Sequence, residues 1–169
     1  MKGIVVYKGI HGSTEQYALW ISSELGMEMK CSDDVSIQEI TEANIIIMGS
    51  SVYKGRLSLA GWMEKHKEIL LSKKLYLFTV SGTHPTEEKI LERMLKVSTP
   101  ELLQGKYRHY PLHGSMKKRD LSFSERLLVR FGSKVPENET ISKKIRDFNY
   151  VSINNIRPIV DDILKCIEA

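Results

Sequence analysis

Cysteine and long apolar runs are both scarce in this sequence. Only two cysteines, Cys31 and Cys166, occur among 169 residues, and their wide separation argues against a disulfide framework or a metal-binding knuckle. No apolar run approaches the roughly 18 residues that a transmembrane helix needs. The N-terminus leads straight into a strand-like apolar run and lacks the pattern of a signal peptide. We therefore expect a reduced, cytoplasmic protein that forms a single domain over residues 1–169.

Positive charge is unevenly distributed along the chain. The formal net charge is +4, and the hydrophobic and charged fractions, 41% and 27%, are ordinary for a globular protein. Residues 115–135 hold six basic and two acidic side chains, which equals the whole net charge. The basic residues are Lys117, Lys118, Arg119, Arg126, Arg130 and Lys134, and the acidic ones are Asp120 and Glu125. The rest of the chain is formally neutral, so this segment needs its own explanation.

Apolar runs alternate with helical patterns along most of the chain, as in parallel sheets covered by helices. We predict strands at residues 3–7, 27–31, 44–49, 75–80 and 107–112. We predict helices at residues 14–25, at 57–71, from Pro85 onward and at 152–167, with Pro158 kinking the last helix or marking its true start. Residues 115–150 break this rhythm and form an insertion before the last helix. The predicted fold is a three-layer α/β/α sandwich, which binds ligands at the carboxyl ends of its strands.

The first predicted strand is followed by Lys-Gly-Ile-His-Gly-Ser-Thr at residues 8–14. A loop that runs into a helix presents unpaired N–H groups and the positive end of the helix dipole, which together suit a phosphate. Gly9 and Gly12 allow close approach of the backbone, and Ser13 and Thr14 add hydroxyl groups. A plain helix N-cap at Ser13 or Thr14 would look the same. The loop alone leaves both interpretations open, because it matches neither the Walker motif nor Gly-x-Gly-x-x-Gly.

Small residues also follow the third and fourth predicted strands. Residues 49–56 read Gly-Ser-Ser-Val-Tyr-Lys-Gly-Arg, and residues 80–84 read Val-Ser-Gly-Thr-His. A tyrosine at a strand end, here Tyr53, can stack on a planar ring and add about 1 kcal/mol beyond area burial. Gly55 can turn a backbone group toward that ring, although a surface tyrosine in an ordinary turn has the same pattern. Three such loops in register predict one ligand site far more strongly than a single loop does.

With these loops, the sequence resembles the flavodoxin family over nearly its whole length. The family's phosphate pattern, loosely [ST]-x-T-G-x-T, is matched at Gly12 and Thr14, whereas the positions before Gly12 lack its hydroxyl residues. The resemblance implies strand order 2-1-3-4-5 and an FMN cofactor, with residues 10–14 at the phosphate and the other two loops beside the isoalloxazine. Lys8 would offset the phosphate charge if it points inward. The cofactor-binding residues so implied are Lys8, Ile10, His11, Gly12, Ser13, Thr14, Ser51, Val52, Tyr53, Lys54, Gly55, Ser81, Gly82 and Thr83.

Within that family, the chain looks similar to the bacterial quinone-dependent protoporphyrinogen IX dehydrogenases. The likeness rests on Gly-x-Thr-x-x-x-Ala from Gly12 to Ala18, on the segment 49–55, on the Gly114-Ser115 pair and on the basic insertion. It implies an enzyme that passes electrons from protoporphyrinogen IX to a quinone. The alternatives are an electron carrier between redox proteins and a flavodoxin-like module that has lost its cofactor. A pI near 9.0 disfavours the carrier, because carriers of this fold tend to be acidic.

The histidines do not predict a metal site. His109 and His113 would lie roughly 13 Å apart along a strand, too far to share a metal ion, and no catalytic residue is identified. We expect His66 to be solvated on a Lys- and Glu-rich helix. His11 and His84 fall in the ligand loops, where an imidazole can meet the cofactor.

The basic segment 116–131 mixes cations with apolar side chains. This pattern fits an amphipathic helix against an anionic surface, either a membrane or an acidic ligand such as a propionate-bearing tetrapyrrole. A solvated face of an inserted helix is the alternative, and nucleic acid is not expected because no recognised binding motif is present. The partner is therefore a small-molecule substrate or a redox protein, with possible peripheral membrane contact, and the sequence leaves the oligomeric state unknown.

Overall fold

The computed structural model describes residues 2–82, 87–116 and 148–168. The central sheet has the order β2-β1-β3-β5-β6, and all four pairings between these strands are parallel. The strands are β1 (Gly3–Lys8), β2 (Glu28–Cys31), β3 (Ile45–Tyr53), β5 (Lys74–Ser81) and β6 (Tyr107–His113). Counted among these five strands, the order is the predicted 2-1-3-4-5. The predicted three-layer fold is confirmed.

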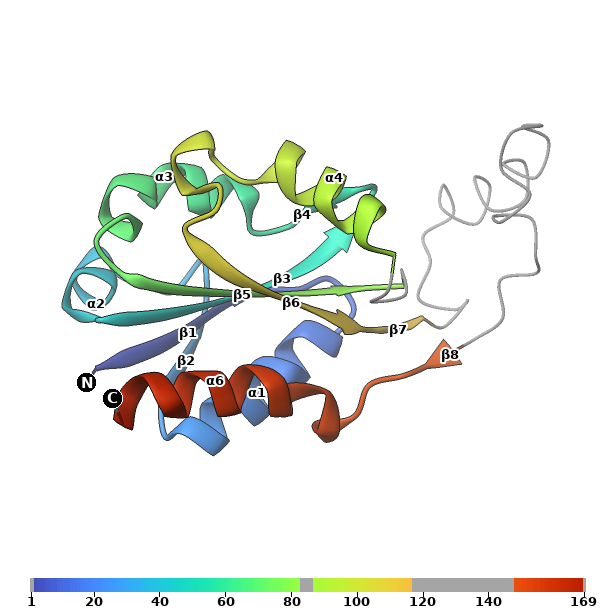
Figure 1. Ribbon diagram of the computed structural model, residues 1–169, viewed down its shortest axis with the longest axis horizontal. Helices are drawn as coiled ribbons and strands as arrows, with labels where there is room; N and C mark the ends of the chain where they lie inside the picture. The colour runs from blue at the N-terminus through green and yellow to red at the C-terminus, as the bar shows by residue number, and fades with distance from the viewer. Residues whose placement is uncertain (1, 83–86, 117–147, 169) are drawn as a thin grey trace.

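Helices cover both faces of the sheet (Figure 1). One face carries α1 (Ser13–Leu25) and α6 (Arg157–Glu168). The other carries α2 (Ile37–Glu42), α3 (Ala60–Leu70) and α4 (Glu88–Ser98), with a short 3₁₀ helix, η1 (Glu101–Leu103), after α4. Within the described ranges, no helix combines the length and the apolar character that crossing a bilayer requires.

Each strand of the sheet centre buries side chains on both faces, as predicted from its unbroken apolar run. In β1, Val5 packs against α1 and α6, whereas Val6 packs against the layer of α2 and α3. Both valines are fully buried. The sequence Ile45-Ile46-Ile47-Met48 repeats this alternation in β3. Two apolar cores therefore hold the sheet between its helical layers.

Strand β3 runs four residues past the predicted end at Gly49. Gly49 lies inside the sheet, where an added Cβ would come within 2.3 Å of the Phe78 ring. The glycine therefore makes room for a buried aromatic ring of β5 and does not end the strand. Beyond it, Val52 and Tyr53 pair with the two-residue strand β4 (Arg56–Leu57) in an antiparallel hairpin.

The end of the chain follows the predicted effect of Pro158. A 3₁₀ turn, η4 (Ile153–Ile156), comes first, and Pro158 is the second residue of α6, where a missing N–H costs nothing. Short antiparallel strands β7 (Ser115–Met116) and β8 (Phe148–Asn149) join the two ends of the insertion. Residues 117–147, with most of the basic segment, lie outside the described residues.

Candidate functional site

The loops predicted to bind a ligand meet at one edge of the sheet, at the carboxyl ends of the parallel strands. Lys8 at the end of β1 is paired with Ser50 of β3. Ser51 is paired with Val80 of β5, and Ser81 is paired with His113 of β6. The strand register therefore brings the three loops together with a fourth segment, the end of β6.

The loop after β1 ends in a helix start that has no side-chain cap. Gly12 is the N-cap residue, with φ 81° and no side-chain cap, a backbone conformation that favours glycine. Gln16 N–H donates to the Gly12 carbonyl at 3.0 Å, so the N–H groups of Ser13, Thr14 and Glu15 precede the helical hydrogen bonds. The interpretation of Ser13 or Thr14 as N-cap is therefore wrong.

The side chains of Ser13 and Thr14 hold this loop in place. The Ser13 hydroxyl lies 2.8 Å from the Ser115 hydroxyl, and the Ser115 N–H donates to Ser13 Oγ at 3.3 Å. Thr14 is buried, and a Cβ on Gly9 would approach the Thr14 Cβ to 2.9 Å. The loop thus folds tightly over Thr14 and is tied to the end of β6.

The Lys8 charge at the start of this loop is paired within the protein. Lys8 Nζ donates to Asp33 Oδ1 at 2.9 Å, and this ion pair lowers the pKa of Asp33. Ile10 and His11 are exposed. The Tyr7 hydroxyl donates to Glu15 at 3.0 Å, and burial together with this bond raises the pKa of Tyr7 to about 12. The N–H groups of the first turn, and not the Lys8 charge, are therefore the donors that this loop has available for an anion.

The second candidate loop is a tight hairpin. Lys54 and Gly55 form its two-residue turn with φ 49° and 73°, the positive values of a type I′ turn. The Lys54 ammonium lies 5.1 Å from the centroid of the Tyr53 ring. Val52 is half-buried against the apolar core on the α3 side. The hairpin holds Tyr53 half-buried at the edge of the sheet.

The serine hydroxyls before this hairpin are engaged within the protein. The Ser51 hydroxyl lies 2.7 Å from the Ser58 hydroxyl, and Leu59 N–H donates to Ser50 Oγ at 3.1 Å. These bonds hold the start of α3 against β3. A contact of Ser51 with a cofactor would therefore use its backbone.

The third candidate loop is described only in part. Ser81 ends β5, its carbonyl accepts a hydrogen bond from Gly114 N–H at 2.9 Å, and Gly82 is exposed. Thr83 and His84 lie outside the described residues.

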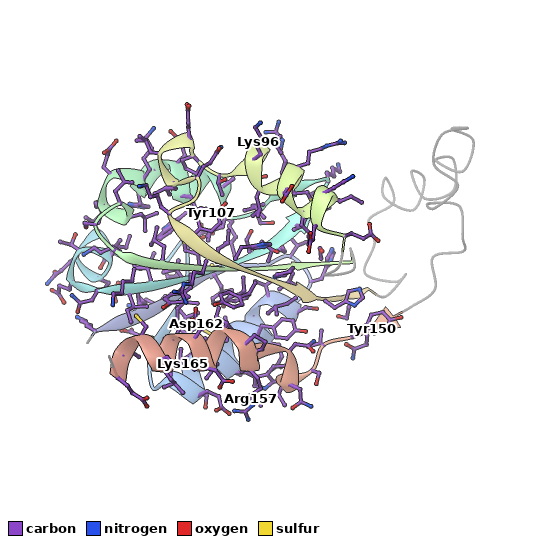
Figure 2. The ribbon with its side chains drawn as sticks, in the orientation of Figure 1. Lys96, Tyr107, Tyr150, Arg157, Asp162 and Lys165 are labelled. Carbon is purple, nitrogen blue, oxygen red and sulfur yellow. The ribbon has the colours of Figure 1, made fainter. Side chains whose placement is uncertain are left out.

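A histidine–tyrosine pair that the sequence did not single out lies at the end of β6. The His113 and Tyr150 rings stack with centroids 4.5 Å apart and planes inclined by 12°. The Tyr17 hydroxyl donates to the His113 carbonyl at 2.7 Å and accepts from Asn155 at 2.8 Å. Figure 2 places Tyr150 at the end of the molecule where β7 and β8 meet. The Gly114-Ser115 pair was the available signal, because it marks where this strand reaches the site.

Two histidines, His66 and His109, lie on or beside the central sheet and not in the candidate loops. His66, expected to be solvated, is buried on α3 beside Trp62, with ring centroids 5.0 Å apart. Its helical spacing from Trp62 and Met63 puts it on their buried face, which outweighs its charged neighbours. His109 lies 2.9 Å from the Thr79 hydroxyl, and burial lowers its pKa to about 4. Among the described residues, no three His, Cys, Asp or Glu side chains are grouped to hold a metal ion.

Comparisons with known proteins agree with this architecture. A family model described as a flavodoxin domain matches residues 4–143. A comparison with curated proteins found no match. The chain is similar to the solved structure of the Trp repressor binding protein from Bacillus subtilis, with 18% identity and a TM-score of 0.52 over 67% of this chain and 85% of that one.

Two further solved structures are similar to the chain. Smu.1420 from Streptococcus mutans has 13% identity and a TM-score of 0.50 over 75% of this chain and 93% of that one. A flavodoxin from the domain Archaea has 25% identity and a TM-score of 0.46 over 75% of this chain and 93% of that one. The likenesses to the Bacillus subtilis and Streptococcus mutans proteins concern the fold alone. Because the family model spans residues 4–143, well over half of the sequence, the chain belongs to the flavodoxin family.

Proposed function

We propose that this protein is an FMN-dependent oxidoreductase. The observation that carries the proposal is the loop after β1, where the N–H groups of Ser13, Thr14 and Glu15 precede the first helical hydrogen bond. Such a helix start suits a phosphate, because the free donors and the helix dipole both favour negative charge. Membership of the flavodoxin family supports FMN as the molecule that carries this phosphate.

The residues present fit the other parts of FMN as well. Tyr53, held half-buried by the hairpin turn, offers an aromatic face for the isoalloxazine. Ser81 and Gly82 lie at the end of the neighbouring strand. When bound, FMN supplies the redox chemistry, and the protein supplies binding, orientation and electrostatics. A catalytic acid–base pair is therefore not required of this chain.

The specific reaction that we propose is oxidation of protoporphyrinogen IX, with electrons passed to a quinone. Support comes from the sequence likeness of residues 12–18, 49–55 and 114–115 to enzymes of that activity and from the basic charge of 115–135. In this proposal the segment 116–131, which lies mostly outside the described residues, recruits the acidic porphyrinogen or the face of a quinone-bearing membrane.

Binding of FMN is tested first by the visible spectrum of the purified protein and by titration with FMN. Replacing Thr14 by alanine should weaken FMN binding by about tenfold, the loss expected for one hydrogen bond to a charged group. Ser23→Ala is the matched control, because Ser23 is exposed near the other end of α1. A protein that stays colourless with excess FMN would contradict the proposal.

The reaction is tested by anaerobic reduction of the FMN-loaded protein with protoporphyrinogen IX, followed by quinone-dependent turnover. Deleting residues 116–131 should leave FMN bound while turnover collapses. A gentler variant replaces Lys117, Lys118 and Arg119 by alanine, and its control replaces Lys89, Arg93 and Lys96, three exposed cations of α4. Unchanged turnover in the deletion would rule out that role for the segment.

The second candidate function is an electron carrier between redox proteins, which the family includes. A redox titration separates the two functions. Two well-separated one-electron steps would favour the carrier, whereas one two-electron step with quinone turnover would favour the enzyme.

A further inference from the structure

A second polar cleft lies beside the proposed FMN site, between the loop after β2 and the start of α3. Its volume is about 420 Å³, within the range of small-molecule sites. Its lining residues are Lys8, Ser32, Asp33, Val35, Ile37, Ser58, Gly61, Trp62, Lys65 and His66. Only Lys8 belongs to the residues assigned to FMN. We propose that this cleft binds a small aromatic carboxylate.

The start of α3 supplies the first donors for such an anion. Met63 N–H donates to the Leu59 carbonyl at 3.0 Å, so the N–H groups of residues 60–62 precede the helical hydrogen bonds, as those of α1 do. Gly61 of this first turn lines the cleft, and nothing lies within 4 Å of the position a Cβ would take. The backbone is therefore accessible at the point where the helix dipole is positive.

Trp62 provides an independent sign that a ligand belongs here. The residue lines the cleft with 8% exposure, and its Nε1–H is buried without an acceptor among the described residues. A buried donor left unpaired costs about 1–3 kcal/mol. A ligand oxygen that accepts a hydrogen bond from this N–H would offset the cost.

The charges and apolar walls define the ligand class. Lys65 makes no ion pair within the described part of the chain, whereas the Lys8 charge is matched by Asp33. The apolar wall comes from half-buried Val35 and from Ile37, which is 59% exposed at the mouth. One unmatched cation beside an apolar wall fits one carboxylate on a planar apolar body.

His66 makes this binding depend on pH. Burial and the charge of Lys65 lower the pKa of His66 below its usual value, so the ring is neutral near pH 7. The other charged groups at the cleft are Lys8 from β1 and Asp33 from the loop after β2. A carboxylate bound beside His66 favours its protonated form. Affinity should therefore rise as pH falls from about 8 to about 5.5, where a carboxylate is still ionised.

Benzoate, with benzamide as the uncharged match, is the probe, and it is titrated into protein saturated with FMN. The readout is nuclear magnetic resonance of the indole N–H groups. The chain has two tryptophans, so Trp20 on α1 is an internal control that the Trp20→Phe variant assigns. The expected result is a shift of the Trp62 signal by benzoate, a weaker effect of benzamide and no shift of the Trp20 signal.

Substitutions on α3 complete the test. Lys65→Met should weaken benzoate binding by about tenfold, whereas Lys67→Met should not, because Lys67 pairs with Glu64 and does not line the cleft. His66→Gln should abolish the pH dependence; if that variant does not fold, Lys65→Met still decides.

Equal affinity for benzoate and benzamide would overturn the proposal. So would displacement of FMN by benzoate, because the cleft would then be part of the cofactor site. Binding of benzoate to a protein that never takes up FMN would leave this inference standing while the proposed function fails.

Discussion

The loop after β1 and the hairpin after β3 have similar compositions but use their polar groups differently. Residues 9–14 and residues 49–55 each contain two glycines and two serine or threonine residues at the carboxyl end of a buried strand. After β1, Gly12 caps α1 without a side chain and leaves the N–H groups of the first turn free for a ligand. Near the end of β3, Ser50 and Ser51 are bonded to the segment that starts α3. Composition at a strand end therefore predicts where a site lies but not which groups face it.

The largest expected effect is a loss of stability on substitution of Gly49 in β3. Gly49→Ala places a methyl group 2.3 Å from the Phe78 ring, which is fully buried in the core on the α1 and α6 side. We expect the free energy of unfolding in urea to fall by roughly 2–3 kcal/mol, with FMN affinity unchanged in the folded protein. Gly61→Ala is the control, since its methyl group meets open space and should stabilise α3 by up to about 1 kcal/mol. Equal stability of the two variants would show that the β5 ring can shift.

Gly12→Ala should affect binding more than packing. No atom lies within 4 Å of the new Cβ, but φ at this position is 81°, so the left-handed backbone costs about 1–2 kcal/mol. We expect FMN affinity to fall by about tenfold because the strained cap displaces the donors of the first turn. Isothermal titration with FMN measures the change. An unchanged affinity would remove the contrast with Gly49.

Two pairs of serine hydroxyls, one in each segment, allow the same substitution to be compared at both places. Ser51 pairs with Ser58 at 2.7 Å, and Ser13 pairs with Ser115 at 2.8 Å. Replacing either Ser51 or Ser13 by alanine should cost about 1 kcal/mol of stability. Only Ser13→Ala should also weaken FMN binding, because the Ser13–Ser115 bond ties down the loop whose N–H groups we propose hold the phosphate, whereas the Ser51–Ser58 bond joins β3 to the start of α3. If both variants lose affinity alike, the Ser51 hydroxyl in β3 faces the cofactor after all.

The smallest expected effect concerns the hairpin turn. Lys54 adopts φ 49° directly before Gly55, a position where asparagine is preferred. Lys54→Asn should raise the midpoint of thermal unfolding by the equivalent of about 0.5 kcal/mol. Lys54→Val should lower it, since a β-branched residue resists positive φ. If the two variants melt together, the turn conformation contributes nothing to stability.

Local sequence signals predicted the strands well and the short helix poorly. The central strands follow from apolar runs that show burial on both faces, whereas the strand order came from the resemblance to the flavodoxin family. Helix α2 was not predicted, because its six residues are too few for a clear period. The signal that could have found it is the capping box of Ser36 and Glu39. Hydrogen bonds to Glu39 from Lys30 and from its capping-box partner Ser36 lower the pKa of Glu39 to about 2.

The sequence predicted which loops come together, but not which of their groups are free to bind a ligand. The sequence alone determined which loops follow the parallel strands and hence that they meet at one edge, because parallel pairing aligns carboxyl ends. Only the tertiary structure decided that Lys8 turns to Asp33, that Ser51 is engaged by Ser58, and that His66 is buried. Each of these contacts joins segments that a period or a motif treats separately. A side chain's partner depends on what the fold brings within about 3 Å of it, and that distance is a property of packing.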